Sequence, residues 1–295
     1  MLTISEIRSK NDFIQYLQSS QERYTAAHRR LATYLIHHFI EVAFMKAQQW
    51  AQKAETSEVS VIRFVRVLGF KGYPEFSEKM QQVIRKEMTM TDYAEMTTKK
   101  QPHGMDIFLE AVQAERKNLQ EMSEKYSPKV MAAIISKINR AERVIVLGLR
   151  SSAPLAEYCS YMIARSLGKE VLLIKDHGSH TFDRLLSWEG KPAVVIAFAY
   201  PRYPSQTLKI AEHLKSKGWP LIGITNDELS PLVPISDHVL YAPSHSLAFT
   251  DSLGAPALLI NTLIVEMIHK YPQSTMETIT RFEKLAKEHR YFWPD

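Results

Sequence analysis

The sequence contains very little cysteine and no long hydrophobic run, and these absences exclude several classes of protein. Cys159 is the only cysteine among 295 residues, so neither a disulfide framework nor a thiolate metal cluster is expected. Its apolar neighbours predict a buried, unreactive thiol. No stretch of about 18 apolar residues exists to span a membrane, and the N-terminal segment MLTISEIRSKNDF lacks the core of a signal peptide. We therefore expect a protein of the reducing cytoplasm that does not act at a membrane.

The sequence also lacks the residue patterns of common catalytic and metal sites. Paired carboxylates, a nucleophile beside a base and a phosphate-binding lysine loop are all absent from the predicted strand ends. Glu157 and Asp183 stand alone and are expected to be solvated. The loop Asp176-His177-Gly178-Ser179-His180 has no further cysteine or acidic cluster at the spacing of a metal site. We therefore predict no catalytic residue, no metal and no cofactor.

The basic charge of the chain is concentrated near its beginning. The length suggests about two domains, and an apolar fraction of 45% is ordinary for a protein that buries a core. Of the net charge of +5, most lies in residues 1–100, which carry 15 basic and 11 acidic side chains, against 22 and 21 in residues 101–295. A surface that binds phosphates is therefore expected in the first third of the chain.

The most informative stretch, residues 44–76, predicts two short helices separated by a tight turn. The first helix is expected at Lys46–Ala54 and the second at Ser57–Leu68. Ser57 is a good N-cap, because its hydroxyl can accept a hydrogen bond from an unpaired amide of the first turn. Glu58 adds negative charge where the helix dipole favours it, and Gly69 is the expected stop.

The second of these helices has one apolar and one polar face, as a DNA-reading helix does. Val61, Phe64, Val65 and Leu68 fall at helical spacing. Two short helices with small polar residues and arginines along the second are the plan of a helix-turn-helix DNA reader. We expect base edges to be approached by residues near the start of the second helix: Ser57, Glu58, Ser60 and Val61. We expect phosphates to be gripped mainly by Arg63, Arg66 and Lys71.

The remainder of residues 1–88 also reads as helical and is expected to form the first domain. Arg23–His37 has apolar residues at helical spacing and is the predicted support helix. Another helix should begin near Pro74, since proline is tolerated in the first turn, and run to Met88. Residues 89–105 are polar, lack periodicity and contain Pro102 and Gly104, so they are the predicted interdomain linker.

Residues 106–295 are expected to form an α/β domain that contains a parallel sheet, with a bridging helix before the sheet and helices at the C-terminal end. Helices are predicted at Asp106–Lys125 and Pro128–Asn139, before the first strand, and the apolar stretch Gly254–Ile268 predicts a buried late helix. Between them lie short apolar runs, at Arg143–Leu147, Val171–Ile174, Ala193–Phe198, Pro220–Thr225 and His238–Tyr241. Helical segments alternate with most of these runs, at Ala153–Leu167, His180–Leu186 and Thr207–Lys217. This alternation predicts a five-stranded, doubly wound parallel sheet with helices on both faces.

Ligands of open parallel sheets bind at the carboxyl ends of the strands, and polar loops follow several of the predicted strands. Gly148 to Ala153 opens a helix with two serines and an arginine, a favourable anion site. The loop at residues 199–205 is stiffened by two prolines and contains an arginine. We predict that a small anionic ligand is contacted by Arg150, Ser151, Ser152, His177, Arg202, Tyr203, Ser246 and Ser252.

Taken together, these features resemble the RpiR (MurR/RpiR) family of bacterial transcription regulators over nearly the whole chain. In the DNA-binding part the likeness rests on Ser57-Glu58-Val59-Ser60-Val61-Ile62-Arg63-Phe64, Leu68-Gly69-Phe70 and Gly72-Tyr73-Pro74. In the second part it rests on Gly148–Ser152 with Ala156, on Ser230-Pro231-Leu232, and on Asp251-Ser252-Leu253 with Ala255-Pro256. The resemblance implies a helix-turn-helix domain joined to a sugar isomerase (SIS) domain that senses a sugar phosphate or a related metabolite.

The chain departs from the family pattern at two places. Glu55 stands in the turn where the family usually has glycine, so we expect a slightly different turn geometry there. Where many SIS domains have Ser-Gly-x-Thr, this chain has Pro201-Arg202-Tyr203-Pro204. At this loop we expect the phosphate-binding hydroxyls to be missing and an arginine to be gained.

We therefore predict a cytoplasmic regulator of carbon metabolism that binds double-stranded DNA and is controlled by an anionic metabolite. A homodimer or homotetramer would read a pseudo-palindrome whose half-sites lie about 34 Å apart, or a multiple of that. Two alternatives remain open at this point. One is a sugar-phosphate isomerase, which would need a base near the reacting carbons, and the other is a metabolite-binding protein whose helical half serves only in assembly.

Overall fold

The computed structural model describes residues 4–7, 9–87, 91, 94, 107–176, 183, 185–247 and 250–292. The chain divides into two compact units, Met1–Tyr93 and Ala94–Asp295, and each is described by itself. The predicted linker, residues 89–105, lies almost wholly outside the described residues. The domain boundaries 1–88 and 106–295 therefore stay a prediction.

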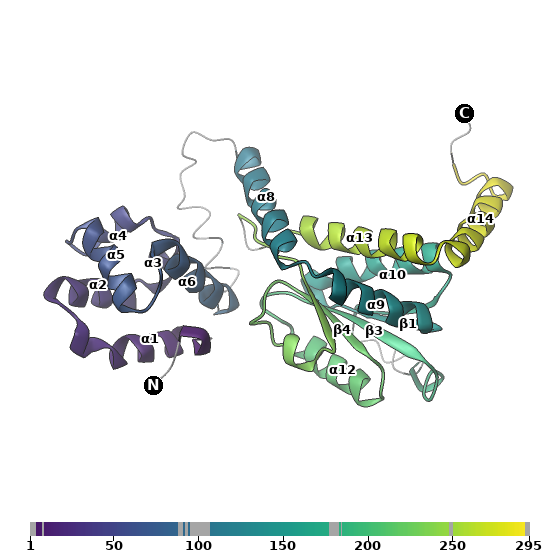
Figure 1. The fold of residues 1–295 in the computed structure, drawn as a ribbon, viewed down its shortest axis with the longest axis horizontal. Coiled ribbons are helices and arrows are strands. Elements are labelled where there is room, and N and C mark those ends of the chain that lie inside the picture. The colour runs from purple at the N-terminus through teal and green to yellow at the C-terminus, as the bar shows by residue number, and fades with distance from the viewer. Residues whose placement is uncertain are drawn as a thin grey trace. The chain divides into compact units, whose positions relative to one another are not determined.

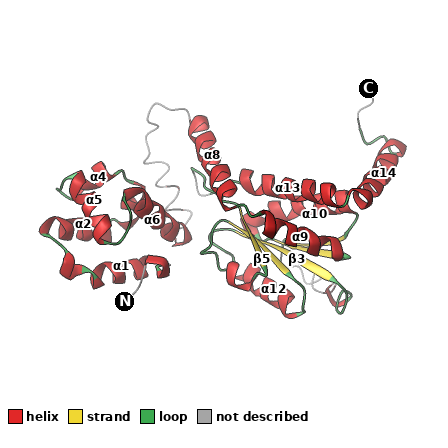
Figure 2. Cartoon of the chain, viewed as in Figure 1, coloured by secondary structure: helices red, strands yellow, loops and turns green. Residues whose placement is uncertain are grey.

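The N-terminal unit is helical throughout its described residues, which confirms the expectation from sequence (Figure 2). Its α-helices are α1 (Lys10–Ser19), α2 (Ala26–His37), α3 (Phe39–Phe44), α4 (Ala47–Lys53), α5 (Glu58–Val67) and α6 (Tyr73–Glu87). Short 3₁₀ turns lie at Ile4–Glu6 and Gln21–Arg23. Side-chain hydroxyls begin two of the helices, because Ser9 caps α1 and Thr25 caps α2.

Aromatic rings hold this unit together. The rings of Trp50 and Phe76 stack with their centroids 5.2 Å apart, and Phe13 meets Phe39 edge to face at 5.5 Å. Trp50 also meets Phe64 of α5 at 5.9 Å. Such pairs contribute about 0.5–1.5 kcal/mol each beyond the burial of their area. α5, the helix that is predicted to contact DNA, is therefore held in place by these aromatic contacts.

The C-terminal unit contains the predicted five-stranded parallel sheet, in the order β2-β1-β3-β4-β5. The strands are β1 (Arg143–Leu147), β2 (Glu170–Ile174), β3 (Ala193–Ala199), β4 (Leu221–Thr225) and β5 (His238–Tyr241). Each agrees with the prediction to within one residue at either end. β2 is added on one side of β1, and β3, β4 and β5 follow on the other side. The order of the strands therefore reverses between β1 and β3, which are hydrogen-bonded neighbours.

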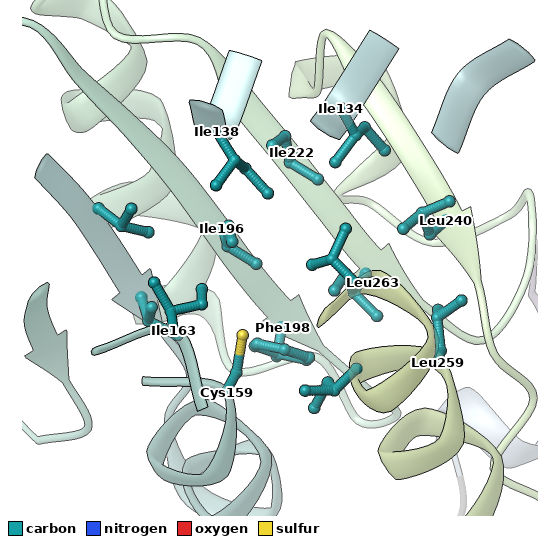
Figure 3. Packing of buried hydrophobic residues seen from close by; sticks show 14 of the residues in the cluster. Ile134, Ile138, Cys159, Ile163, Ile196, Phe198, Ile222, Leu240, Leu259 and Leu263 are labelled. Carbon is teal, nitrogen blue, oxygen red and sulfur yellow. The ribbon is translucent and has the colours of Figure 1, made fainter. Parts of the chain in front are cut away.

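Both faces of the sheet are buried, as the continuous apolar strands predict. Val144 and Val146 of β1 pack into one core with α9 (Pro128–Arg140), α10 (Ala153–Leu167) and α13 (Gly254–Lys270). Figure 3 shows part of this core, including Cys159, Phe198 and Leu263. Ile145 and Leu147 point to the opposite face, where α12 (Ser205–Ser216) covers a second core. Figure 1 shows α12 on one side of the sheet and α9, α10 and α13 on the other.

Two further helices belong to this unit, one before the sheet and one near the C-terminal end, and helices were expected at both places. α8 (Ile107–Lys125) matches the helix predicted before the sheet, and it packs against α13. α14 (Pro272–Glu288) is a C-terminal helix whose bounds were not predicted, and it packs against α10 and α13. The helix predicted at 180–186 falls largely outside the described residues. Within the described ranges, no helix has both the length and the apolar character needed to cross a membrane.

Candidate nucleic-acid interface and effector site

Helices α4 and α5 and the turn between them form the predicted helix-turn-helix. The Ser57 hydroxyl accepts a hydrogen bond from the Ser60 amide over 3.2 Å, which confirms Ser57 as the N-cap of α5. At the other end, the Phe70 amide donates to the Val65 carbonyl and the Gly69 amide to the Arg66 carbonyl. These are the two bonds of a Schellman motif, with Gly69 at φ 90 in the left-handed position. The predicted limits of α5 are therefore produced by local chemistry.

The turn after α4 is built in the same way but with a different residue. The Thr56 amide donates to the Ala51 carbonyl over 2.8 Å, and the Glu55 amide to the Gln52 carbonyl over 3.2 Å. Glu55 has φ 51, which is the left-handed conformation that glycine adopts without strain. The turn thus keeps a glycine-like backbone at this position, and not the altered one that the sequence led us to expect. The backbone at Glu55 is therefore strained, because residues with a Cβ are disfavoured in the left-handed region.

The outer surface of α5 contains most of the residues that were predicted to contact DNA. Ser57, Glu58, Arg63, Arg66 and Lys71 are exposed, and Ser60 is half-buried. The Ser57 and Ser60 hydroxyl oxygens lie 2.9 Å apart and are hydrogen-bonded to each other. The Ser57 hydroxyl also accepts from the Ser60 amide. Exposed arginines on this face are the arrangement that phosphate contact requires.

Val61 is a correction to the predicted DNA-binding set. Its side chain is completely buried, together with those of Phe64 and Val65, so it belongs to the face that packs on the unit and cannot reach a base edge. Val59, which the prediction omitted, is instead 56% exposed at the start of the helix. The helical spacing in the sequence could have predicted both positions, because residues 61, 64, 65 and 68 form one apolar stripe and residue 59 lies opposite it.

A buried histidine, His28, packs against the buried face of α5. The ring of His28 packs between those of Phe64 and Tyr24, with centroids 5.4 and 6.4 Å away. Its Nδ1 atom is buried without a partner. Burial, and then the positive charge of Arg63, lower the pKa of His28 below its ordinary value of 6.5. The imidazole is therefore neutral at pH 7 and packs as an aromatic ring.

In the C-terminal unit, the loop after β1 presents the first cluster of predicted ligand contacts. A Cβ at Gly148 would lie 2.6 Å from the Ser152 carbonyl oxygen and 2.9 Å from the Ala156 Cβ, so only glycine permits this close approach. Arg150 is exposed at φ 55, and Ser151 is exposed beside it. Ser152 is only 1% exposed, and its hydroxyl is buried without a hydrogen-bond partner. Such a hydroxyl is available to a ligand.

The loop after β3 lies next to the first, because β1 and β3 are neighbours. Arg202 is exposed, while the Tyr203 hydroxyl donates to the Asn226 side-chain oxygen over 2.8 Å. The hydroxyl of Thr207, in the first turn of α12, is completely buried and has no partner. Thr207 lies beyond the Pro201–Pro204 segment, in α12, so the expectation that this segment lacks phosphate-binding hydroxyls stays a prediction. Thr207 was overlooked because it follows the unusual Pro-Arg-Tyr-Pro segment by several residues.

Both helices that follow these loops begin without a side-chain cap. The residues before α10 and α12, Ser152 and Pro204, make no capping hydrogen bond through their side chains. The N-cap side chains thus leave the amides of each first turn uncapped, and each helix start has a partial positive charge. Tyr200, at the end of β3, adds a third buried hydroxyl without a partner. Burial, and then the nearby Asp251, raise the pKa of Tyr200 well above 10, so it remains a neutral donor.

The loop after β5 is held to α8 by a polar cluster that the sequence did not indicate. The buried Asn118 accepts from the His245 amide over 3.0 Å and donates to the His245 carbonyl over 2.9 Å. Ser252, a predicted ligand contact, donates to Glu115, and His245 lies 3.4 Å from Glu121. Ser246, another predicted contact, is half-buried in the same loop. Polar residues on a Glu-rich helix normally indicate a solvated face. The contacts of Glu115 and Asn118 with the loop after β5 are visible only in the folded structure.

Three further predictions concern His177, Cys159 and metal binding. His177 lies outside the described residues. Cys159 is buried in the sheet core, and burial raises the pKa of its thiol to about 12, which makes it unreactive as expected. Among the residues that the structure describes, no group of three His, Cys, Asp or Glu side chains could hold a metal ion.

Comparison with known families matches both units. Residues 11–87 match the helix-turn-helix domain of the rpiR family, and residues 137–266 match the SIS domain. An uncharacterized HTH-type transcriptional regulator of Clostridium perfringens is 20% identical over 90% of this chain and 95% of its own. A second such protein, from Providencia stuartii, is 24% identical over 89% of this chain and 92% of its own.

Solved structures share the fold. The Vibrio vulnificus NanR protein, complexed with ManNAc-6P, aligns with a TM-score of 0.58 at 21% identity, covering 93% of this chain and 98% of its own. The sugar isomerase domain of an RpiR transcription factor from Sphaerobacter thermophilus aligns with a TM-score of 0.56 at 23% identity, over 60% of this chain and 97% of its own. At these identities the likeness establishes the fold.

Proposed function

The chain belongs to the rpiR family, with a helix-turn-helix domain followed by a SIS domain, and from this premise we propose that it is a DNA-binding transcription regulator controlled by a small anionic metabolite. The observation that carries the DNA-binding part is the exposed pair of Arg63 and Arg66 on the outer face of α5. A helix fixed by its apolar face, with cations on the opposite face, suits insertion into the major groove.

The exposed residues of the reading helix divide between two tasks. Arg63, Arg66 and Lys71 contact phosphates and set the register of the helix, while Glu58 and Ser60 lie near the base edges. Ser57 contributes mainly by capping the helix, since its hydroxyl already accepts the Ser60 amide. A homodimer or homotetramer would present two such helices to a pseudo-palindromic operator, with half-sites about 34 Å apart or a multiple of that.

The effector binds where the chain reverses direction between β1 and β3. Two uncapped helix starts and the unpartnered hydroxyls of Ser152 and Thr207 support an anion at this edge of the sheet. The exposed Arg150 and Arg202 follow the same two strands and add positive charge. NanR is described in complex with the sugar phosphate ManNAc-6P, which supports a sugar phosphate or a related compound as the ligand class. Ser151, Tyr203, Ser246 and Ser252 complete the proposed set.

DNA binding is tested by the salt dependence of the two arginine variants. We expect Arg63→Ala and Arg66→Ala each to weaken binding to a duplex from the DNA that flanks the gene. Each should also lower the slope of log K against log salt by about one, because a phosphate contact releases about one counterion. Arg281→Ala, which removes an exposed arginine of α14, is the matched control and should bind as the parent does. Unchanged affinity and slope in both variants would contradict the proposal.

Effector binding is tested by thermal shift against sugar phosphates, sugar acids and other small anions. A compound that binds the folded state raises the melting temperature. The same compounds test the alternative of an isomerase, for which the proposal expects no turnover. Conversion of a sugar phosphate by the purified protein would overturn the assignment as a regulator without catalysis.

A further inference from the structure

Val59 is an unusual residue for the surface on which it lies. Among the described residues of the N-terminal unit, it is the only large apolar side chain that is exposed, at 56%. Other large apolar residues of this unit, such as Phe64 on the same helix, are buried or half-buried. Valine is also a weak helix former, because its branched Cβ loses rotamer freedom in a helix. Packing and helix propensity therefore do not explain a valine at this position.

The position of Val59 around the helix is informative. Successive residues of an α-helix are rotated by about 100°, so residues 59, 63 and 66 fall within about 60° of one another. Arg63 and Arg66 are exposed on this face, and Val61, Val65 and Leu68 are buried on the opposite one. Val59 thus stands at the N-terminal end of the stripe of arginines, in the first turn of the helix.

Val59 is the apolar member of the exposed residues at the start of α5, beside Ser57 and Glu58. The hydroxyl of Ser57 is engaged by the Ser60 amide, and the two serine hydroxyls lie 2.9 Å apart. Glu58 is exposed beside Val59, and its carboxylate can only accept hydrogen bonds from base edges. An apolar group that enters the major groove finds one apolar partner among the base edges, the C5-methyl group of thymine.

We propose that Val59 contacts a thymine methyl group and thereby specifies a T·A pair at one position of each operator half-site. This inference rests on the proposed DNA-binding function and assigns to it a specificity-determining residue. Contact between the valine methyls and the thymine methyl removes apolar surface of both from water. No hydrogen bond is needed, so the preference should vanish when either methyl partner is removed.

The test first obtains a binding sequence and then deletes methyl groups on both sides. The full chain selects duplexes from a random pool, and each thymine of the selected half-site is replaced by deoxyuridine, which lacks only the methyl group. For the parent protein, we expect one replacement in a half-site to weaken binding about fourfold, the equivalent of about 0.8 kcal/mol for one buried carbon. Replacement in both half-sites should weaken it about 16-fold, since distant sites add.

The same series is measured with Val59→Ala and Val59→Ile. Val59→Ala should bind the selected duplex less tightly and should no longer distinguish thymine from deoxyuridine, whereas Val59→Ile should keep the distinction. Because Val59 is exposed and alanine favours a helix, the Ala variant should fold, and its circular dichroism spectrum should match the parent's.

The outcomes separate this inference from the function on which it rests. If the parent enriches no sequence, the proposed DNA-binding function fails and this inference with it. If a sequence is enriched but no methyl deletion affects binding, or if Val59→Ala retains the methyl preference, then this inference alone is overturned.

Discussion

The Tyr16 hydroxyl donates a hydrogen bond to the carbonyl oxygen of Leu68 over 2.6 Å and so joins α1 to the end of α5. The Leu68 carbonyl is one of the groups that a helix end leaves without an intrahelical partner. Burial raises the pKa of Tyr16 above 10, despite an opposing influence from Arg23, so the hydroxyl remains a donor at all ordinary pH values. The end of α5 is thus joined to α1 by a contact between residues 52 positions apart in the chain.

Removal of the Tyr16 hydroxyl should loosen the end of the reading helix. We expect Tyr16→Phe to lower local stability by about 1 kcal/mol, the net value of a typical hydrogen bond. Hydrogen exchange of peptides from α5 in the full chain should then speed up about fivefold. Tyr34→Phe is the matched control, because the Tyr34 bond to Glu41 is exposed at 3.2 Å and should contribute little. Equal effects of the two variants would show that the bond to Leu68 adds nothing.

Replacement of Glu55 by glycine should stabilise the helix-turn-helix. Glu55 occupies a left-handed conformation at φ 51, and a residue with a Cβ loses about 1–2 kcal/mol in this region. Glycine removes that strain but loses more chain entropy on folding, so the net gain should be about 0.5–1 kcal/mol. It is measured as slower hydrogen exchange of α4 and α5. Glu55→Ala separates the charge from the backbone, since it retains the Cβ and should show no gain.

The stability of the N-terminal unit should fall on acidification because of His28. Its pKa is lowered in the folded protein, first by burial and then by Arg63, so the unfolded chain binds the proton more tightly. Stability therefore rises with pH where the unfolded histidine titrates, and it declines as the pH falls below about 6.5. Hydrogen exchange of α2 and α5 at pH 7.5, 6.5 and 5.5 should show this decline. His28→Phe should reduce this decline. His37 is exposed, so His37→Gln should show the same decline as the parent.

The buried hydroxyl of Thr207 should affect the free and the ligand-bound protein in opposite directions. It has no partner in the protein, so Thr207→Val should stabilise the free chain by about 1 kcal/mol by removing an unpaired polar group. If Thr207 holds the effector, the same variant should lose most of the thermal shift produced by an active anion. Thr278→Val is the control, because its hydroxyl bonds to the Ser274 carbonyl on α14, away from the strand ends. A full thermal shift in Thr207→Val would remove this residue from the site.

Much of the fold follows from patterns that act over a few residues. The strands were predicted to within one residue because continuous apolar runs are needed wherever both faces of a sheet are covered. The limits of α5 followed from Ser57 and Gly69, whose capping bonds involve only neighbouring amides and carbonyls. The error at Val61 had a local cause as well, since its helical position already assigned it to the buried face.

The parts of the site that escaped prediction join distant segments. Thr207 could be recognised only once its hydroxyl was known to be buried and unpartnered at the start of α12. Glu115 and Ser252 meet across 137 residues, and Asn118 reaches His245 across 127. No spacing along the chain indicates such pairs, because they depend on how α8 packs against α13.

The amino-acid sequence alone determined that this protein has a helical helix-turn-helix unit followed by a parallel sheet, because caps, periodicity and apolar runs act through neighbouring residues. Only the tertiary structure decided which side chains are available to a ligand or to DNA. Exposure, as for Val59, and the lack of a partner, as for Ser152, are properties of the packed chain, set by contacts between segments that the sequence keeps far apart.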